Sequence, residues 1–469
     1  MPAPSTPAPP IEARLVLLSG WGGAAVAGST VVHRRADDLA GLRRLVESAP
    51  PRGVIARGLG RSYGDCAQNG GGVALRLDAA AGEMSIDPAT ATVTVGGGVT
   101  LDAVLRASVP AGLFLPVSPG TRLVTVGGAI AGDIHGKNHH VDGTFGTHVR
   151  SLDLLLASGE VVTIGPDAGN DAELFWATVG GMGLTGVILR ATVAMLPIET
   201  SRCSVDTERI ADLDTLLARM DADDHAFRYS VAWIDPMARG ASLGRSVLTR
   251  GDHARIEELS PRQAADPLAY RPGHLATVPP LVPRPGVMNR ASIAAFNELW
   301  FRKAPRHRVG QLAPIPRFFH PLDAVGRWNR LYGRRGFVQY QVVVPFGAER
   351  ALRRLVERLA GGGVPSFLAV LKRFGAANPA PLSFPAPGWT LAVDVPGGTA
   401  GLAPLLAELD GVVLDAGGRH YLTKDAATTA AAIRRGYPRL DEWRRVRDRA
   451  DPRRRWASDQ SRRLRLVGD

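Results

Sequence analysis

Glycine-rich segments between residues 57 and 186 constrain the fold of this chain more than any other feature of its sequence. The first, residues 57–65 (RGLGRSYGD), follows a short apolar run typical of a β-strand. Glycines let the backbone turn sharply, so that several N–H groups can face one phosphate. A Rossmann loop is excluded, because residues 69–72 do not favour the helix that must follow and the third glycine comes one position late. A P-loop is excluded because no Gly-Lys-Ser/Thr follows.

Three further segments add to this pattern. Pro119-Gly120-Thr121 precedes a run of small residues at 126–132, residues 135–140 contain three histidines, and residues 179–186 hold another glycine turn. Each segment has a simple structural explanation on its own, such as tight helix–sheet packing or the end of a helix. Together, within one part of the chain, they predict a long ligand that is held by backbone groups and carries a phosphate-bearing portion.

The histidine segment raises the alternative of a metal site. His135 and His139 are four residues apart, which on a helix would place both on one face, as zinc ligands can be. Gly136 disfavours a helix, however, and no glutamate follows His135 as in a metalloprotease motif. We therefore predict no bound metal, and we leave open that some of these histidines are only packed or surface groups.

The composition narrows the class of protein. The 469 residues, 45% of them hydrophobic, allow about two to three domains and exclude a largely disordered chain. No stretch approaches the roughly 18–20 uncharged apolar residues of a membrane-spanning helix. The two cysteines, Cys66 and Cys203, cannot supply a disulfide framework, although one bridge stays open. Residues 1–10 lack the pattern of a secretory signal peptide, and residues 1–14 are predicted to be a disordered tail.

The chain is also basic, with a formal net charge of +12. Ten arginines gather between residues 444 and 465, where intervening acidic residues dilute their charge. Such an excess suits nucleic acid, an anionic membrane surface or a phosphorylated ligand, and it equally suits the solvated face of a helix. Charge alone does not decide between these partners.

The pattern of apolar residues predicts both strands and helices. Strands are expected at 54–56, 73–77 and 91–95, in a hairpin at 152–164 with its turn at Ser158-Gly159, and at 229–234 and 338–344. Helices are expected at 101–107, at 171–176 with Asn170 as the N-cap, at 210–220, and from about 428 onward with a break at Pro452. The Pro-rich residues 279–285 are typical of an exposed loop. The expected fold class is therefore α+β.

These four segments, in this order, resemble the FAD domain of the vanillyl-alcohol oxidase family, also called the p-cresol methylhydroxylase type. The resemblance extends to Gln339-Tyr340-Gln341, to residues 384–389 (FPAPGW) and to residues 421–425 (YLTKD), and it covers the chain from about Leu15 to Leu466. Within that family the whole set resembles the oxidases of polyprenyl-phosphoryl pentoses. The glycine-rich loops alone would identify only the superfamily.

The resemblance implies a two-domain fold in which the FAD-binding domain spans residues 15–200 and is completed by a C-terminal segment, 419–469. An antiparallel-sheet substrate domain would span residues 201–418. It also implies non-covalent FAD with His135 near the flavin. The implied cofactor-binding residues are Arg57, Gly58, Leu59, Gly60, Arg61, Ser62, Tyr63, Pro119, Gly120, Thr121, Gly127, Gly128, Ile134, His135, Gly136, Gly183, Ile188 and Tyr421.

The implied chemistry is oxidation of a secondary alcohol, in which FAD performs the redox step while protein groups orient the sugar and handle the proton. The expected catalytic residues are Lys424, Tyr63 and Gln341. The expected substrate-binding residues are Lys137, Gln339, Gln341, Lys372 and Lys424, with Lys137 or Lys372 paired to the substrate phosphate. The chain departs from the family pattern at three positions, where Met182 and Thr390 replace asparagines and Ala392 replaces a cysteine.

The implied reaction is oxidation of the ribose 2-hydroxyl of a polyprenyl-phosphoryl-β-D-ribose to the 2-keto sugar, the first half of epimerisation to the arabinose form for cell-wall arabinan. The expected partners are that lipid-linked sugar, a short-chain NAD(P)H-dependent keto-reductase and an anionic membrane surface, with no nucleic acid. The expected location is peripheral at a membrane, on a side that stays undecided. The alternatives are an oxidase of a soluble alditol or aldonolactone and, from the charge alone, a flavin-free nucleic-acid-binding protein.

Overall fold

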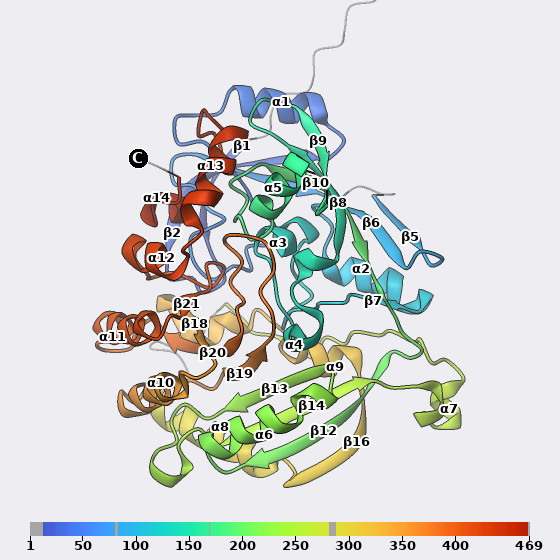
Figure 1. Cartoon of the computed structure of the whole chain (residues 1–469), viewed down its shortest axis with the longest axis vertical. Helices are drawn as coiled ribbons and strands as arrows, with labels where there is room; N and C mark the ends of the chain where they lie inside the picture. The colour runs from blue at the N-terminus through green and yellow to red at the C-terminus, as the bar shows by residue number, and fades with distance from the viewer. Residues whose placement is uncertain (1–12, 80–82, 168, 281–287, 468–469) are drawn as a thin grey trace, which may run out of the picture.

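The structure is a computed structural model that describes residues 13–79, 83–167, 169–280 and 288–467. Within these residues the chain is α+β and builds two sheets from its N-terminal part and one large antiparallel sheet from its middle part. Figure 1 shows the large sheet in the lower part of the molecule, with the N-terminal elements above it.

The N-terminal sheet has the strand order β1-β2-β4-β3, in which β1 and β2 are antiparallel and β2, β4 and β3 are parallel. The second sheet is antiparallel, with the order β5-β6-β10-β8-β9. The strands of these two sheets are β1 (Ala13–Ser19), β2 (Val26–Arg35), β3 (Val54–Ala56), β4 (Val73–Asp78), β5 (Met84–Asp87), β6 (Thr92–Gly96), β8 (Val149–Leu155), β9 (Val161–Ile164) and β10 (Val187–Ala194).

The large sheet has the order β16-β12-β14-β13-β19-β20-β18-β21. Its strands are β12 (Arg202–Ile210), β13 (Tyr229–Ile234), β14 (Ser246–His253), β16 (His307–Pro314), β18 (Phe337–Pro345), β19 (Ala369–Phe374), β20 (Gly388–Pro396) and β21 (Arg419–His420). Two short pairs complete the strands, namely β7 (Leu113–Phe114) with β11 (Leu196–Pro197), and β15 (Ala276–Thr277) with β17 (Val325–Gly326).

The helices lie between and around these sheets. They are α1 (Leu39–Glu47), α2 (Leu101–Ser108), α3 (Val126–Ala131), α4 (His139–Asp142), α5 (Gly169–Thr178), α6 (Leu213–Asp223), α7 (Pro261–Ala264), α8 (Arg290–Lys303), α9 (Ile315–Phe319), α10 (Glu349–Gly361), α11 (Leu402–Asp415), α12 (Ala430–Gly436), α13 (Leu440–Ala450) and α14 (Asp459–Arg463). Short 3-10 turns lie at Val109–Ala111, Phe145–His148, Asp224–Ala226, Gly240–Ser242, Ile256–Glu258, Pro321–Ala324 and Trp328–Arg335.

The large sheet has two chemically different faces, because side chains alternate along a strand. On one face Ala232, Leu248 and Leu391 join a core cluster with apolar residues of α6, α10 and α11. Their strand neighbours Trp233 and Thr249 point the other way and line a cavity. One face of the sheet is therefore a packed core, and the other is a wall available to a ligand.

The C-terminal helices return to the N-terminal sheet. Ile433 of α12, Trp443 of α13 and Leu464, which follows α14, share a core cluster with Val31 and Ile55 of the N-terminal strands. Figure 1 shows these helices, in red, beside the blue N-terminal elements. The segment between β21 and α12 thus connects the large sheet to the N-terminal layer.

Most of the expected elements are confirmed. The helix at 101–107 is α2, which Thr100 caps by accepting from the N–H of Ala103. The hairpin at 152–164 is formed by β8 and β9 around Gly159, whose φ is +86°. The strands at 229–234 and 338–344 are β13 and the core of β18, and α13 ends at Ala450, before Pro452.

Three expectations are wrong at element boundaries. The helix expected to begin at Ile210 begins at Leu213, because Ile210 completes β12 and Asp212 caps α6 through the N–H of Thr215. Asn170 lies inside α5, which already begins at Gly169. Ala13 and Arg14, expected in a disordered tail, pair with β2 as the first residues of β1. Residues 1–12, and residues 281–285 of the expected Pro-rich loop, lie outside the described residues.

Candidate functional site

A cavity of about 690 Å³ lies between the N-terminal layer and the free face of the large sheet. Its walls come from the loop after β3, the α3 region, the turn before β10, alternate residues of the large sheet and the segment after β21. A volume in this range is typical of small-molecule and cofactor sites. Elements that are far apart in sequence thus build one site.

The loop at residues 57–64 presents an unusual run of free backbone donors. Arg57 donates its N–H to Leu75 O and Tyr63 donates its N–H to Thr423 O, at 2.7 and 3.0 Å. The backbone N–H groups from Gly58 to Ser62 make no hydrogen bond within the described residues. Consecutive unpaired N–H groups at a cavity form a cradle for an anion such as a pyrophosphate.

The two arginines of this loop have different surroundings. The Arg57 guanidinium donates to the carbonyl oxygens of Ala67 and Ser19, at 2.7 Å each, and burial lowers its pKa. The Arg61 guanidinium lies 3.9 Å from the centre of the Trp21 ring, which is a cation–π contact. Arg57 therefore fixes the loop while the backbone provides the cradle.

The loop also touches the segment after β21 at close range. A Cβ on Gly64 would overlap the carbonyl oxygen of Asp425, so the two backbones approach as only glycine allows. The turn from Tyr421 to Asp425 is closed by the N–H of Lys424, which donates to Tyr421 O at 2.9 Å. This approach carries Lys424 to the loop that holds Tyr63.

The α3 region forms the opposite wall. Thr125 caps α3 by accepting from the N–H of Gly128, and Gly127 donates its N–H to Gly97 O at 2.9 Å. Thr121 donates to Asp323, which also accepts from the backbone of Arg122. A Cβ built on Gly120 would meet nothing within 4 Å, so the backbone at this position borders open space.

His135 is held as a neutral ring. Its pKa lies well below the usual value, first because of burial and then because of the nearby Lys372. Gln341 donates to His135 Nε2 at 3.0 Å and to Thr390 Oγ1 at 3.2 Å. His135 Nδ1 is buried and has no hydrogen-bond partner within the described residues. This ring nitrogen therefore has bonding capacity that a ligand atom could use.

Three lysines gather in the same cavity. Burial lowers the pKa of Lys137 to about 8, of Lys372 to about 7 and of Lys424 to about 8. Lys137 Nζ donates to Phe318 O at 2.5 Å, and Lys424 Nζ lies 3.9 Å from the centre of the Tyr63 ring. The chain contains only four lysines, so three of them line this one cavity. Partly buried lysines with lowered pKa values are candidates for anion binding and proton transfer.

The buried carboxyl group of Asp394 acts electrostatically on Lys424. Asp394 accepts from Gln339 Nε2 at 2.5 Å and from Tyr332 OH at 3.5 Å. Burial raises the pKa of Asp394 to about 7, while the Asp394 charge opposes the burial that lowers the pKa of Lys424. Burial, followed by the charge of Asp394, raises the pKa of Tyr63 well above 10, so its phenol stays protonated.

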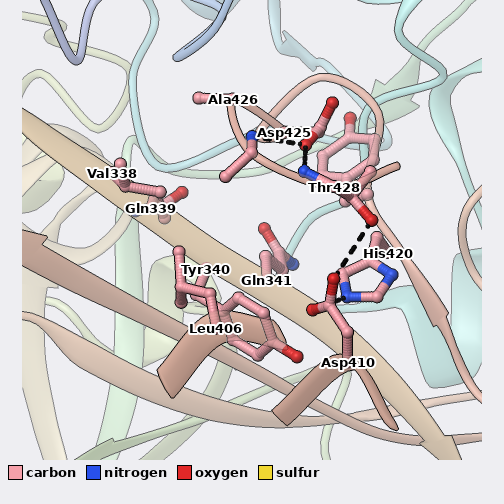
Figure 2. A pocket seen from close by; sticks show the side chains of 12 residues that line it. Val338, Gln339, Tyr340, Gln341, Leu406, Asp410, His420, Asp425, Ala426 and Thr428 are labelled. Atoms are coloured by element: carbon pink, nitrogen blue, oxygen red, sulfur yellow. Dashed lines mark hydrogen bonds and ion pairs between the residues drawn. The ribbon is translucent and has the colours of Figure 1, made fainter. Parts of the chain in front are cut away.

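A second, much smaller cavity of about 20 Å³ lies beneath the turn that carries Lys424. Figure 2 shows that Asp410 contacts both His420 and Thr428, and His420 Nε2 lies 2.7 Å from the Asp410 carboxylate. Asp425 in turn accepts from the backbone N–H groups of Ala427 and Thr428. The space suits a single water molecule, so this cluster holds the turn in place and is not a second ligand site.

The sequence-predicted site residues all line the large cavity. These are Arg57, Gly58, Leu59, Gly60, Arg61, Ser62, Tyr63, Pro119, Gly120, Thr121, Gly127, Gly128, Ile134, His135, Gly136, Lys137, Gly183, Ile188, Gln339, Gln341, Lys372, Tyr421 and Lys424. The structure thus brings every one of them together, and their individual roles stay predictions.

The three departures from the family pattern also lie at this site. Met182 lines the cavity with a left-handed φ of +56°, which asparagine tolerates better than methionine, and its sulfur accepts from Thr423 Oγ1 at 3.9 Å. Thr390 accepts from Gln341, as described above, and Ala392 lines the cavity directly. The substitutions therefore change side chains at the site, and the cavity is still formed.

The remaining histidines and the cysteines have structural roles. His139 Nδ1 accepts from the N–H of Gly375, and His140 Nε2 contacts the carbonyl oxygens of Asp224 and Phe227. Within the described ranges no group of histidine, cysteine or acidic residues is placed to hold a metal ion. The two cysteines are buried free thiols, so the bridge that the sequence left open is not formed.

Several residues at or beside the cavity were not predicted from the sequence. Asp394 and the aromatic residues Trp233, Phe296, Trp300 and Phe367 were not predicted, although all but Asp394 line the cavity. A signal was available for Trp233, because it alternates with core-facing residues in a predicted strand. The scarcity of lysine in a chain rich in arginine was a further signal for the three site lysines.

Several of the C-terminal arginines form ion pairs with acidic residues of the same chain. Arg447 is fully buried and paired with Asp451, and Arg463 bridges Asp65 and Asp425. Among the described residues, ion pairs within the chain include those formed by Arg444, Arg447, Arg449, Arg462 and Arg463. Much of this charge therefore stabilises the fold.

The comparison with known proteins agrees with this site. A family described as an FAD binding domain matches residues 31–165, which include the anion cradle and the wall at 119–136. The orphaned N–H groups of the loop, the unpaired His135 Nδ1 and the open space at Gly120 fit such a cofactor. The chain is an FAD-binding oxidoreductase, as the resemblance to the vanillyl-alcohol oxidase family implied.

Similarity over the whole chain defines the family more closely. The chain is 46% identical to decaprenylphosphoryl-beta-D-ribose oxidase of Mycolicibacterium smegmatis over 453 residues, 96% of this chain and 97% of that protein. It is 26% identical to L-gulono-1,4-lactone dehydrogenase of Mycobacterium tuberculosis over 95% of this chain and 98% of that protein. It is 31% identical to alditol oxidase of a Streptomyces species over only 38% of this chain and 42% of that protein. The chain belongs to the family of the decaprenylphosphoryl-β-D-ribose oxidases.

No helix among the described residues is both long and apolar enough to span a membrane.

Proposed function

We propose that this protein uses FAD to oxidise the 2-hydroxyl of a polyprenyl-phosphoryl-β-D-ribose to the 2-keto sugar. The observation that carries the proposal is the set of three partly buried lysines in a cavity that also contains an anion cradle. The cradle suits the pyrophosphate of FAD, and the lysines suit a second anion, the phosphate of the sugar. The 46% identity to an oxidase of a decaprenylphosphoryl ribose supports the same substrate class.

Bound FAD would supply the oxidant that takes the hydrogen and the electron pair from C2 of the sugar. Residues 57–64, 119–121, 127–128 and 134–136 would hold the cofactor, together with Gly183, Ile188 and Tyr421, without a covalent bond. Tyr421 is fixed for this task, because its OH donates to Gly132 O at 2.7 Å and its ring stacks on Phe384. Residues 15–200 and 419–469 would form the FAD-binding unit around it.

Lys424 would handle the proton of the reacting hydroxyl. Because burial lowers its pKa to about 8, Nζ can lose and regain a proton near neutral pH. The contact with the Tyr63 ring limits the positions of the ammonium group. Gln341, fixed by His135 and Thr390, and Gln339, fixed by Asp394, would orient the sugar hydroxyls.

Lys137 and Lys372 would bind the substrate phosphate. The Lys137 ammonium is already oriented by Phe318 O and by the adjacent aromatic rings. A phosphate between two partly desolvated cations would restore the pKa of both lysines towards ordinary values. The aromatic side chains of Trp233, Phe319 and Phe367 line the same cavity and would exclude water from the reacting sugar.

The proposal implies a place in a reaction sequence and in the cell. A 2-keto sugar is consumed by reduction, so a short-chain NAD(P)H-dependent keto-reductase would complete the epimerisation to the arabinose form used for cell-wall arabinan. A lipid-linked substrate would keep the enzyme at a membrane as a peripheral protein. The side of the membrane is left open.

The test is an anaerobic flavin spectrum of the FAD-loaded protein. Detergent-dispersed polyprenyl-phosphoryl ribose is expected to bleach the flavin, whereas a soluble alditol or aldonolactone is not. Bleaching by the soluble sugar alone would assign the protein to the alternative function, which its distant relatives with those substrates represent. A flavin that stays oxidised with the lipid-linked ribose would contradict the proposal.

A further inference from the structure

A stripe of exposed apolar side chains runs along α8, at the rim of the large cavity. Phe296, Leu299 and Trp300 keep 40%, 67% and 46% of their surface exposed. Spacings of three and four residues place them on one face of the helix. Phe296 and Trp300 also line the cavity, and their rings stack with centres 6.0 Å apart. The stripe is therefore both cavity wall and outer surface.

The side of α8 next to the stripe is firmly anchored to the molecule. Ile293 is buried, and the buried Asn297 donates to Asp235 Oδ1 at 2.8 Å and to Ser366 O at 3.1 Å. Phe296 meets Phe367 edge to face, with ring centres 5.8 Å apart. These contacts fix the rotation of the helix, so the stripe faces outward as a result of the packing.

The segment that carries the stripe is rich in positive charge. Residues 290–308 contain five lysines and arginines and a single acidic residue, Glu298, which pairs with Arg245 and Arg302. Lys303 follows Trp300 at the end of the helix, and Arg306 and Arg308 are exposed around the adjacent edge strand β16. Aromatic and aliphatic side chains flanked by cations are typical of helices that lie in the interface of an anionic bilayer.

A second exposed leucine lies by another part of the rim. Leu275 keeps 82% of its surface exposed, and its N–H donates to Ala324 O at 2.8 Å. Leu322, two residues before Ala324, lines the cavity. Apolar surface therefore borders the cavity at more than one place.

We propose that the stripe of Phe296, Leu299 and Trp300 docks the protein on an anionic lipid bilayer, so that the cavity rim faces the lipid. The inference rests on the proposed function, because a polyprenyl-phosphoryl sugar keeps its hydrocarbon chain in the bilayer while the sugar enters the protein. Docking at α8 lets the sugar phosphate reach the site lysines without exposing the chain to water. Figure 1 places α8 in the lower part of the molecule, away from the arginine-rich α13 and α14.

The experiment measures binding of the full-length, FAD-loaded protein to vesicles by flotation. Vesicles of phosphatidylcholine and phosphatidylglycerol are expected to carry the wild-type protein, and vesicles of phosphatidylcholine alone to carry less. Leu299→Asp is expected to reduce the bound fraction by about tenfold, because it places a charge in the apolar interface. Leu299 does not line the cavity, so FAD content and unfolding temperature should stay at the wild-type values.

Leu17→Asp is the matched control, because Leu17 is 77% exposed on β1 and the substitution changes the net charge equally. It is expected to float like the wild type. Equal loss of flotation in both variants, wild-type flotation of Leu299→Asp, or no binding of the wild type to anionic vesicles would each overturn the inference. Loss in Leu17→Asp alone would assign docking to β1 and would overturn it as well.

Flavin reduction separates this inference from the proposed function. With detergent-dispersed polyprenyl-phosphoryl ribose, Leu299→Asp is expected to reduce its flavin like the wild type, whereas with vesicle-borne substrate it is expected to be about tenfold slower. A wild-type flavin that is not reduced in detergent contradicts the proposed function. Equal rates of flavin reduction by wild type and variant with vesicle-borne substrate contradict docking at α8 and leave the proposed function untouched.

Discussion

The side-chain amide of Gln339 donates a 2.5 Å hydrogen bond to the buried carboxylate of Asp394, directly across the β18–β20 pair. This hydrogen bond belongs to a group of interactions around Asp394 that reaches Lys424 at the proposed reaction centre. Asp394 also accepts from Tyr332, and its charge is the one that favours the ammonium form of Lys424. Asp394 does not line the cavity, yet it influences the protonation of Lys424, the lysine that would touch the substrate.

Asp394→Asn tests this influence through the pH profile. Burial lowers the pKa of Lys424 to about 8 and the negative charge of Asp394 opposes that shift, so removing the charge lowers the pKa of Lys424 further. The limb of kcat/KM that follows Lys424 is expected to move to lower pH by about one unit. An acidic limb that moves indicates a neutral lysine acting as base, and an alkaline limb that moves indicates an ammonium group that polarises the hydroxyl.

Asp410→Asn provides the comparison for that profile. Asp410 is a partly buried carboxyl group that lies under the turn with His420, as Figure 2 shows, and it is not among the charges that shift the pKa of Lys424. This variant is expected to be less stable with an unshifted profile. A profile of Asp394→Asn that coincides with the wild type would show that the two groups are not coupled.

Lys424→Met tests the lysine itself. The variant is expected to keep its FAD, because the N–H cradle at residues 58–62 and the α3 wall are untouched. Flavin reduction by the lipid-linked ribose is expected to slow by about 10²- to 10⁴-fold, the usual contribution of a positioned proton-transfer group. Stopped-flow absorbance of the flavin under anaerobic conditions measures both points. Near-normal reduction with full FAD content would remove Lys424 from the reacting centre.

Local motifs made much of this site predictable. The glycine loop at 57–64 and the Lys424 turn are short segments whose backbone conformation depends on their own residues, and the structure brings them together as expected. Asp394 could not be found in this way, because its meaning depends on the pairing of β20 with β18, 55 residues away in sequence. The ion pairs of the C-terminal arginines could not be predicted for the same reason, since Arg463 bonds to its partner Asp65 across 398 residues.

Gly120→Ala tests the position of the cofactor without relying on turnover. A Cβ at Gly120 would meet no protein atom within 4 Å, and its φ is not in the left-handed region, so the apoprotein is expected to tolerate alanine within about 1 kcal/mol. If FAD lies against this backbone, the added methyl group is expected to weaken FAD binding by about tenfold or more. Titration of the apoprotein with FAD by fluorescence measures the affinity, and denaturant unfolding measures the stability.

Gly411→Ala is the control for that measurement, because Gly411 lies in α11 and its Cβ would also meet nothing within 4 Å. A helical glycine replaced by alanine is expected to gain about 0.5–1 kcal/mol of stability. Its FAD affinity should match that of the wild type. Unchanged affinity of Gly120→Ala would place the cofactor elsewhere in the cavity.

Arg463→Met tests whether the C-terminal helix α14 holds together the loop that carries Tyr63 and the turn that carries Lys424. The Arg463 guanidinium bonds to Asp65 at 2.6 Å and to Asp425 at 2.8 Å, and these residues follow the segments that carry Tyr63 and Lys424. Both carboxylates are nearly buried, so losing their shared cation is expected to cost about 3 kcal/mol of unfolding free energy. Arg449→Met removes an exposed pair with Glu173, 64% and 56% exposed, and is expected to cost less than about 1 kcal/mol. Urea unfolding of the two apoproteins measures the difference, and equal losses would show that Arg463 does not clamp the site.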